Sequence, residues 1–242
     1  MVRVCLNGSR WAADGAVVPL TPAALAQSAA GAVAAGATEV DVRPRTPCGR
    51  ESLSPRVIAA TLEAIRARVT VPVGVTTPAR AEPGPAADGR ARMHDWTVLP
   101  DFACVDWGEP GAEELTALLL DLGVEAEAAV RSGTDAASRF AASPLGPSVR
   151  RVVVKVTDVS AVTVEQSAYA LLTALGDVHG RPLLLHGQEA TAWPVLRLAG
   201  RLGLATRTGL EDTLHLPDGR RARSNAELLT AALREHADAG RA

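Results

Sequence analysis

The sequence predicts a single (β/α)8 barrel, in which eight parallel strands alternate with helices. Three observations lead to this fold. The chain has 242 residues, within the range of about 200 to 250 residues for one-domain barrels. Short apolar segments alternate along it with longer segments rich in Ala and Leu. No Gly- or Ser-rich linker divides the chain, so we expect one domain over residues 1–242.

The short apolar segments are rich in β-branched residues. They are apolar on both faces, which is typical of strands in a parallel sheet buried on both sides. Eight strands are expected, at residues 2–6, 38–42, 71–75, 102–105, 124–128, 152–156, 183–185 and 204–207.

The longer segments predict helices, and their ends carry the expected punctuation. Thr21-Pro22 and Ser54-Pro55 each pair an N-cap residue with proline at the first helical position, and Gly36 and Gly123 follow two helices as left-handed caps. After the third strand we expect a loop at residues 78–89, which are rich in Pro, Gly and Ala, and then a short helical piece at 92–97. The other helices are expected at residues 22–35, 55–67, 112–122, 135–142, 164–175, 190–202 and 225–236.

The charges of the chain argue against two classes of partner. The 25 basic and 27 acidic residues give a net charge of −2, and the arginines are interspersed with acids. Binding to nucleic acid or to an anionic membrane requires clustered positive charge, so neither is expected. No segment approaches the roughly 18 apolar residues of a membrane span, and the first residues show no signal-peptide pattern. We therefore expect a cytoplasmic protein.

The cysteines and the lysine are few. Cys5, Cys48 and Cys104 are an odd number without CxxC spacing, which disfavours both a disulfide framework and a thiolate zinc site. Cys5 and Cys104 lie in apolar strand-like segments and are expected to be buried. Lys155 is the only lysine among the 25 basic residues, a bias that coding preference alone explains.

Polar residues gather at or near the predicted strand ends, where barrel enzymes carry their active sites. Buried polar groups are costly unless they are paired, so this convergence favours a functional site. Each residue also has a structural alternative: an asparagine can satisfy turn backbone, threonines suit strands, Asp41 and Arg43 can form an ion pair, and a single histidine is often a core residue. The set comprises Asn7, Asp41, Arg43, Thr76, Thr77, Asp106, Glu125, Glu127, Lys155, His186, Arg207, Glu211 and Asp212.

The segment from Arg207 to Asp212 combines an arginine with two adjacent carboxylates. One acid could hold a metal while the other acts as a base. Arg207 could orient that base or bind a substrate carboxylate through two hydrogen bonds. A surface turn that ends in two acids is the structural alternative.

Several motifs together resemble the β-keto acid cleavage enzyme family, whose founding activity is the cleavage of 3-keto-5-aminohexanoate. The resemblance runs nearly end to end and in the same order. It includes Leu6-Asn7-Gly8, Leu185-His186-Gly187 and the run from Thr206 to Leu214. Further matching segments are residues 36–53, 74–77, 96–101, 109–112, 123–126 and 191–194.

This resemblance implies a barrel with a divalent metal, usually zinc, held by a His-x-His pair on the second strand and a Glu after the eighth. It implies that an Asp deprotonates a β-keto acid, which then attacks acetyl-CoA and is cleaved to acetoacetate and a new CoA ester. Residue by residue, Glu211 matches the metal ligand, Asp212 the base and Arg207 the arginine that positions it. The resemblance also implies a homo-oligomer.

The second strand departs from the family pattern, because Asp41-Val42-Arg43 stands in place of His-x-His. Arginine has no lone pair for a metal, and Asp41 with Glu211 beside Arg43 would make a poor zinc site. We therefore expect weak or absent zinc, with Arg43 and Lys155 supplying fixed positive charge instead. Lys155 stands where family members commonly have an acid, and Glu127 stands where they usually have a glycine.

Three functional hypotheses follow. The first is carbon-carbon bond chemistry on a small β-keto acid, with Asp212 as base and with Asn7, Arg43, Thr76, Thr77, Glu125 and His186 binding substrate. The second is a class I aldolase that forms a Schiff base on Lys155, although an ion pair of Lys155 with Glu125, Glu127 or Glu211 is favoured. The third is a barrel that binds a ligand without turnover.

Overall fold

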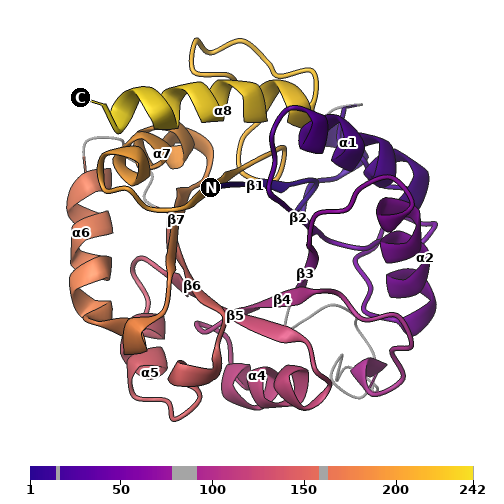
Figure 1. The fold of residues 1–242 in the computed structure, drawn as a ribbon, viewed down its shortest axis with the longest axis horizontal. Coiled ribbons are helices and arrows are strands. Elements are labelled where there is room, and N and C mark those ends of the chain that lie inside the picture. The colour runs from indigo at the N-terminus through magenta and orange to yellow at the C-terminus, as the bar shows by residue number, and fades with distance from the viewer. Residues whose placement is uncertain (15–16, 78–91, 158–162, 242) are drawn as a thin grey trace.

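The computed structural model describes residues 1–14, 17–77, 92–157 and 163–241. Within them, eight parallel strands form one sheet in the order β7-β6-β5-β4-β3-β2-β1-β8. The sheet closes where Leu185 N donates to Ala205 O at 2.9 Å, and Figure 1 looks into the resulting barrel. The strands are β1 (Val2–Cys5), β2 (Glu39–Val42), β3 (Val73–Thr77), β4 (Phe102–Asp106), β5 (Glu125–Arg131), β6 (Arg151–Val156), β7 (Leu183–Gly187) and β8 (Thr206–Thr208).

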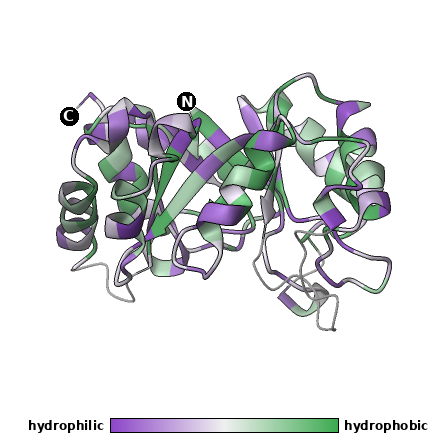
Figure 2. Cartoon of the chain, turned by 90° about the horizontal axis from the view of Figure 1, so that it is seen from below, coloured by the Kyte–Doolittle hydropathy of each residue, from purple (hydrophilic) through white to green (hydrophobic). Residues whose placement is uncertain are grey.

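Helices surround the barrel, and the predicted cap positions are confirmed. The Thr21 hydroxyl accepts from Ala24 N, and Gly36 and Gly123 have φ of 110° and 77°. Ser54 occupies the N-cap position of α2 without a side-chain cap bond. The helices are α1 (Pro22–Ala34), α2 (Pro55–Arg66), α4 (Ala112–Asp121), α5 (Ala136–Ala141), α6 (Val164–Leu175), α7 (Ala192–Arg201) and α8 (Asn225–Ala239). In Figure 2 they carry both green and purple residues, as elements with one face on the sheet should.

Two expectations concern the segment after β3. The predicted loop at residues 78–89 lies outside the described residues. Of the short helical piece expected at 92–97, helical backbone is seen at Arg92 and Met93, and a turn follows. Across the described part of the chain, no helix has the length and hydropathy to cross a membrane.

The main hydrophobic core lies between the strands and the helices, with Val4, Val40, Val75 and Leu196 among its buried residues. A second, smaller apolar cluster contains Cys104, Val153 and Leu184. Cys5 and Cys104 are buried and free, as predicted.

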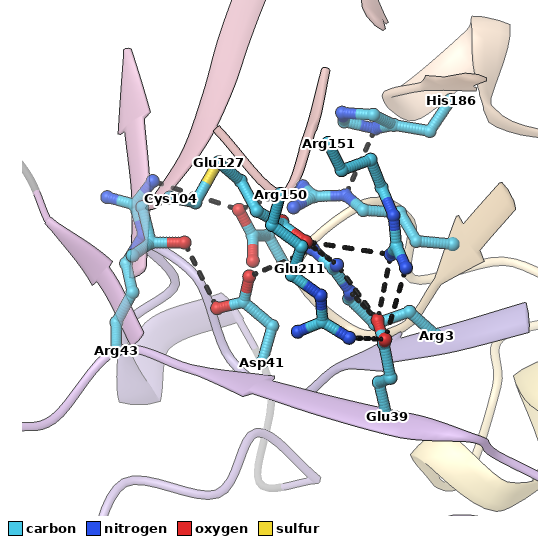
Figure 3. Close-up of polar contacts among 12 residues, drawn as sticks. Arg3, Glu39, Asp41, Arg43, Cys104, Glu127, Arg150, Arg151, His186 and Glu211 are labelled. Atoms are coloured by element: carbon cyan, nitrogen blue, oxygen red, sulfur yellow. Dashed lines mark hydrogen bonds and ion pairs between the residues drawn. The ribbon is translucent and has the colours of Figure 1, made fainter. Parts of the chain in front are cut away.

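Near the amino ends of the strands the barrel contains a buried charge cluster, which we define as Arg3, Glu39, Glu127, Arg150 and Arg151 (Figure 3). Arg3 Nη2 lies 2.9 Å from Glu39 Oε2 and 2.6 Å from Glu127 Oε1. Arg151 Nη1 lies 2.9 Å from the same Glu39 oxygen, and Arg150 also contacts Glu39. These pairs compensate charges that could not be buried singly.

The Phe102 ring supports this cluster, with its centroid 4.5 Å from Arg3 Cζ and 4.8 Å from Arg150 Cζ. Glycine is required beside the ring, because a Cβ on Gly74 would lie 2.0 Å from Phe102 Cε2. Charged and aromatic side chains therefore fill the barrel near the amino ends of the strands. The carboxyl ends are left for the polar residues considered next.

Candidate active site

The structure brings together most of the polar residues that the sequence predicts at the carboxyl ends of the strands. Their side chains come from β2, β3, β6, β7 and β8 and from the loop after β8, and Figure 3 shows several of them. We define the site cluster as Asp41, Arg43, Thr76, Lys155, His186, Arg207, Glu211 and Asp212.

Arg207, on β8, holds the two carboxylates that follow it. Its Nη2 atom lies 2.7 Å from Asp212 Oδ1 and 3.0 Å from Glu211 Oε1. Burial alone would raise the pKa of Asp212, but the charge of Arg207 outweighs it, so this pKa lies well below its usual range. Burial also tends to raise the pKa of Glu211, but the charges of Arg207 and Arg43 outweigh burial and lower this pKa. Both acids are therefore ionised at neutral pH.

The loop that carries these acids is fixed against β1. A Cβ on Gly209 would lie 2.0 Å from Cys5 O, so only glycine allows this approach. The Asn225 side chain, at the start of α8, accepts from Leu210 N at 2.8 Å and donates to Leu6 O at 2.9 Å. These contacts turn the chain back over the barrel mouth.

His186 is a neutral hydrogen-bond acceptor toward Arg207. Arginine can only donate, so its Nε–H, 3.2 Å away, makes His186 Nδ1 the acceptor and leaves the ring proton on Nε2. The 3.5 Å approach of Nδ1 to Asp212 Oδ1 is therefore no hydrogen bond in this tautomer. Burial and then Arg207 lower the pKa of His186 to about 4, in agreement with a neutral ring.

Asp41 and Arg43 occupy the end of β2, and both face Glu211. The Thr76 hydroxyl donates to Asp41 Oδ1 at 3.0 Å. Burial and then the charge of Glu211 raise the pKa of Asp41 to about 7. Arg43 Nη2 lies 3.7 Å from Glu211 Oε1, while its Nη1 lies 3.2 Å from Glu51 Oε2. Glu51 and Glu211 thus hold the Arg43 guanidinium between them.

Lys155 lies near the end of β6, in register with His186 on β7. Within the described part of the chain it forms no ion pair, so the favoured pairing with Glu125, Glu127 or Glu211 is not found. Burial and then Arg207 lower the pKa of Lys155. Among the cations of the site cluster, the Lys155 amine is therefore the one without an ion-pair partner in the described part of the chain.

Five of the residues predicted at strand ends lie outside the site cluster. Asp106, at the end of β4, pairs with Arg131 at 3.4 Å. Glu125 and Glu127 were expected at the end of β5, but this strand runs three residues further than predicted, to Arg131, which places them at its amino end. Glu125 is exposed there and pairs with Arg150 at 3.3 Å, and Glu127 belongs to the buried charge cluster. Asn7 and Thr77 are near the site, but their side chains bind backbone.

The two backbone-binding residues have definite partners. The Asn7 amide donates to Arg43 O at 2.9 Å and accepts from Arg43 N at 3.0 Å. Thr77 donates to Cys104 O at 2.9 Å. Asn7 thus positions Arg43 by joining the ends of β1 and β2. Thr77 faces away from the barrel interior because side chains alternate along a strand.

Strand-end reasoning missed Glu51, which lies in the loop after β2 and contacts both Arg43 and Arg45. No strand-end pattern marks this residue, since it lies nine positions beyond Val42. Its acidic side chain between two basic segments was the available signal.

A zinc ion does not fit the residues of the site cluster. Across the described residues, no group of three or more His, Cys, Asp and Glu side chains could hold a metal. Asp41 and Glu211 offer two carboxylates, whereas zinc sites use three or four ligands, usually with nitrogen or sulfur donors. Arg43 adds positive charge beside them. Asp41 and Glu211, the expected zinc ligands, are thus a pair of carboxylates whose negative charge is compensated by arginines.

Three carboxylate oxygens of the site cluster are buried without a hydrogen-bond partner among the described residues. They are Asp41 Oδ2, Glu211 Oε2 and Asp212 Oδ2. Buried acceptors are rarely left unpaired, and concentrations of such atoms in a protein mark places where a ligand donates. The site cluster is therefore arranged to accept protons or hydrogen bonds from a bound molecule.

Solved structures with the same fold include enzymes. A ternary complex of ObcA with a C4-CoA adduct and oxalate has a TM-score of 0.66 at 14% identity, over 90% of this chain and 63% of that chain. The apo structure of ObcA gives 0.64 at 16% identity, over 90% and 61%. A type I 3-dehydroquinate dehydratase from Clostridium difficile, with covalently modified comenic acid, gives 0.61 at 13% identity, over 97% and 92%. The chain thus spans under two thirds of the length of ObcA.

Comparison with curated proteins finds no significant match. The model of the beta-keto acid cleavage enzyme family, in contrast, matches residues 1–144 and 152–242, which is nearly the whole sequence. The predicted resemblance is confirmed, and the chain belongs to the β-keto acid cleavage enzyme family.

Proposed function

We propose that this protein catalyses carbon-carbon bond cleavage of a small β-keto acid, with an acyl-CoA thioester as co-substrate and acetoacetate and a new CoA ester as products. The observation that carries this function is the buried Arg207-Glu211-Asp212 group, which lies beside the cation Arg43 and keeps two carboxylate oxygens without a hydrogen-bond partner among the described residues. Family membership and the CoA adduct bound to ObcA support it. The family resemblance further favours a homo-oligomer.

Asp212 is the proposed base. Arg207 binds its Oδ1 atom, so Oδ2 is the oxygen that takes the proton. Because Arg207 lowers the pKa of Asp212, this carboxylate is a weak base and suits an acidic C–H bond. The carbon between the two carbonyl groups of a β-keto acid carries such a bond. Arg43 and Lys155 then stabilise the enolate through fixed positive charge.

The substrate carboxylate binds Arg43 in this proposal, while the Thr76 hydroxyl, whose single proton is donated to Asp41, orients Asp41. His186 keeps Arg207 oriented by accepting from its Nε atom. Asn7 is a positioning residue that fixes the Arg43 backbone. Thr77 and Glu125 have no part in the chemistry, because their side chains are engaged elsewhere.

The test is acetoacetate formation from acetyl-CoA and a panel of β-keto acids. Asp212→Asn should lower kcat by about 100-fold or more, the usual effect of losing a general base. Asp121→Asn, an exposed change on α4, serves as the matched control. Absence of acetoacetate with every β-keto acid would overturn the proposed function.

A second candidate function rests on the unpaired Lys155. Its amine could condense with a ketone to give an imine and water, and the lowered pKa favours the neutral nucleophile. Borohydride would reduce such an imine to a stable amine, seen as a mass adduct on Lys155. A wild-type chain without an adduct in the presence of β-keto acid rules this function out. Tight ligand binding with neither adduct nor acetoacetate indicates a barrel that only binds.

A further inference from the structure

A cleft lies beside the site cluster, between the loops that follow β1 and β2 and the first turns of α1 and α2, which are neighbours in Figure 1. Its volume is about 780 Å³. Most of its wall is apolar, and its charged lining residues, Arg45 and Arg56, are both basic. The lining residues are Trp11, Leu20, Thr21, Pro22, Arg45, Thr46, Pro47, Cys48, Gly49, Arg56, Val57 and Ala60.

One wall of the cleft is an aromatic platform. Trp11 is 50% exposed, which is unusual for so large an apolar side chain. Its ring lies on the guanidinium of Arg45, 5.3 Å from centroid to Cζ. Arg45 is 3% exposed and is held by Gly8 O and Gly49 O, yet its Nε atom has no hydrogen-bond partner among the described residues. A flat ring could stack on Trp11 here.

The charge of the cleft favours an anion. Arg56, on the first turn of α2, is exposed and forms no ion pair in the described ranges. A second cavity, of about 650 Å³ near α7 and α8, offers a contrast. Its lining is of mixed charge, with three acids, Asp218, Glu227 and Glu235, beside its three arginines, and two of these arginines form ion pairs there. Of these two cavities, the cleft of Trp11 is the one whose charged lining residues are all basic.

The cleft shares a wall with the site cluster. Arg45 contacts Glu51 at 3.6 Å, Glu51 contacts Arg43 at 3.2 Å, and Arg43 contacts Glu211 at 3.7 Å. Gly8, whose carbonyl binds Arg45, also packs so closely on Glu211 that a Cβ would lie 2.3 Å from Glu211 Cγ. A ligand in the cleft could therefore extend one end to the reacting groups.

We propose that this cleft binds the adenine nucleotide end of the acyl-CoA co-substrate, with the adenine ring stacked on Trp11 and a phosphate on Arg56. The assignment of CoA rests on the proposed function, whereas the nucleotide chemistry follows from the aromatic platform and the unpaired cation. The thioester end then lies toward Arg43 and Glu211. Thus Trp11 and Arg56 determine affinity for the co-substrate and take no part in the chemical step.

Cys48 provides a readout that is independent of catalysis. It lines the cleft and is exposed, whereas Cys5 and Cys104 are buried. Hydrogen bonding to Thr46 and the nearby Arg50 lower the pKa of Cys48 to about 7, so its thiolate reacts readily. Iodoacetamide should therefore add once, to Cys48, and the rate can be followed by intact mass.

The experiment compares alkylation with and without adenosine 3′,5′-bisphosphate, which carries the nucleotide but no thioester. We expect the nucleotide to slow alkylation of Cys48 and adenosine alone to protect poorly. Trp11→Ala and Arg56→Ala should each weaken protection about tenfold, the typical loss of one stacked base or one charged contact. Arg68→Ala, two residues beyond the end of α2, and Tyr169→Ala, another exposed aromatic residue, should change nothing.

Four results separate this proposal from the proposed function. Unchanged alkylation at saturating nucleotide, or equal protection by adenosine, overturns the nucleotide site. So does an active enzyme whose KM for acetyl-CoA is the same in Trp11→Ala and Arg56→Ala as in wild type. Protection of Cys48 in a protein that forms no acetoacetate, in contrast, supports the nucleotide site and overturns the proposed function.

Discussion

At the scale of single residues, the end of β2 decides how the site cluster handles charge. Asp41 lies on β2 and Arg43 directly follows the strand, and both lie close to Glu211. Arg43 supplies a fixed cation that cannot coordinate, and Asn7 and Glu51 hold it in place. In the proposed reaction, the enolate of the β-keto acid would lie beside the Arg43 guanidinium, whose spread-out single charge stabilises an oxyanion less than a divalent metal ion would.

This arrangement predicts a gain of metal binding. The double variant Asp41→His/Arg43→His, together with Glu211, would supply two imidazoles and a carboxylate, the usual set of a catalytic zinc site. We expect about one zinc per chain in this variant and far less in wild type, measured by equilibrium dialysis and metal analysis. Arg68→His, outside the site cluster, is the control. Zinc retained equally by wild type and the double variant would contradict this account of Arg43.

At the scale of elements, the sequence predicted the eight strands and the described helices because their apolar periodicity and caps are local features. The exact residue at which each strand ends, and so which side chains reach the barrel mouth, is not determined by the nearby sequence alone. An error of three residues at the end of β5 moved Glu125 and Glu127 from the amino end of the barrel to its mouth. Thr77 was misplaced by one residue, which reverses the face of a strand. Arg207, Glu211 and Asp212 could be placed because they lie in one short segment.

The buried charge cluster joins four strands and predicts a stability effect. Glu39→Gln leaves Arg3 and Arg151 short of a carboxylate, and we expect a loss of about 3 kcal/mol in the free energy of unfolding, measured with urea. Arg151 and Arg3 outweigh burial and lower the pKa of Glu39 below its ordinary 4.5. Glu39 thus stabilises the fold above pH 4.5 and loses this effect as the pH falls through its native pKa.

The variant should therefore lose less stability than wild type on acidification below that value. Glu125→Gln is the matched control, because Glu125 is exposed and its pair with Arg150 contributes at most about 1 kcal/mol. Equal losses for the two variants would show that the cluster does not bind the strands together.

At the scale of the whole molecule, the site cluster lowers the stability of the fold. Its carboxylates are buried, and three of their oxygens lack a hydrogen-bond partner among the described residues. Functional sites commonly carry such a cost, because groups arranged for a ligand are not paired within the protein. Asp41 allows this cost to be measured, since burial and Glu211 raise its pKa from 3.8 to about 7.

A raised pKa means that the native state keeps a proton which the unfolded chain has already lost, so Asp41 lowers the stability progressively as the pH rises from 3.8 to about 7. Asp41→Asn removes this titration. Its Tm should exceed that of wild type by a margin that is small near pH 4 and reaches roughly 5 °C at pH 8. The exposed Asp121→Asn should show no such trend. A Tm difference between Asp41→Asn and wild type that is independent of pH would mean that Asp41 is already compensated in the native state, and that the cost of the site cluster arises from Glu211 and Asp212 instead.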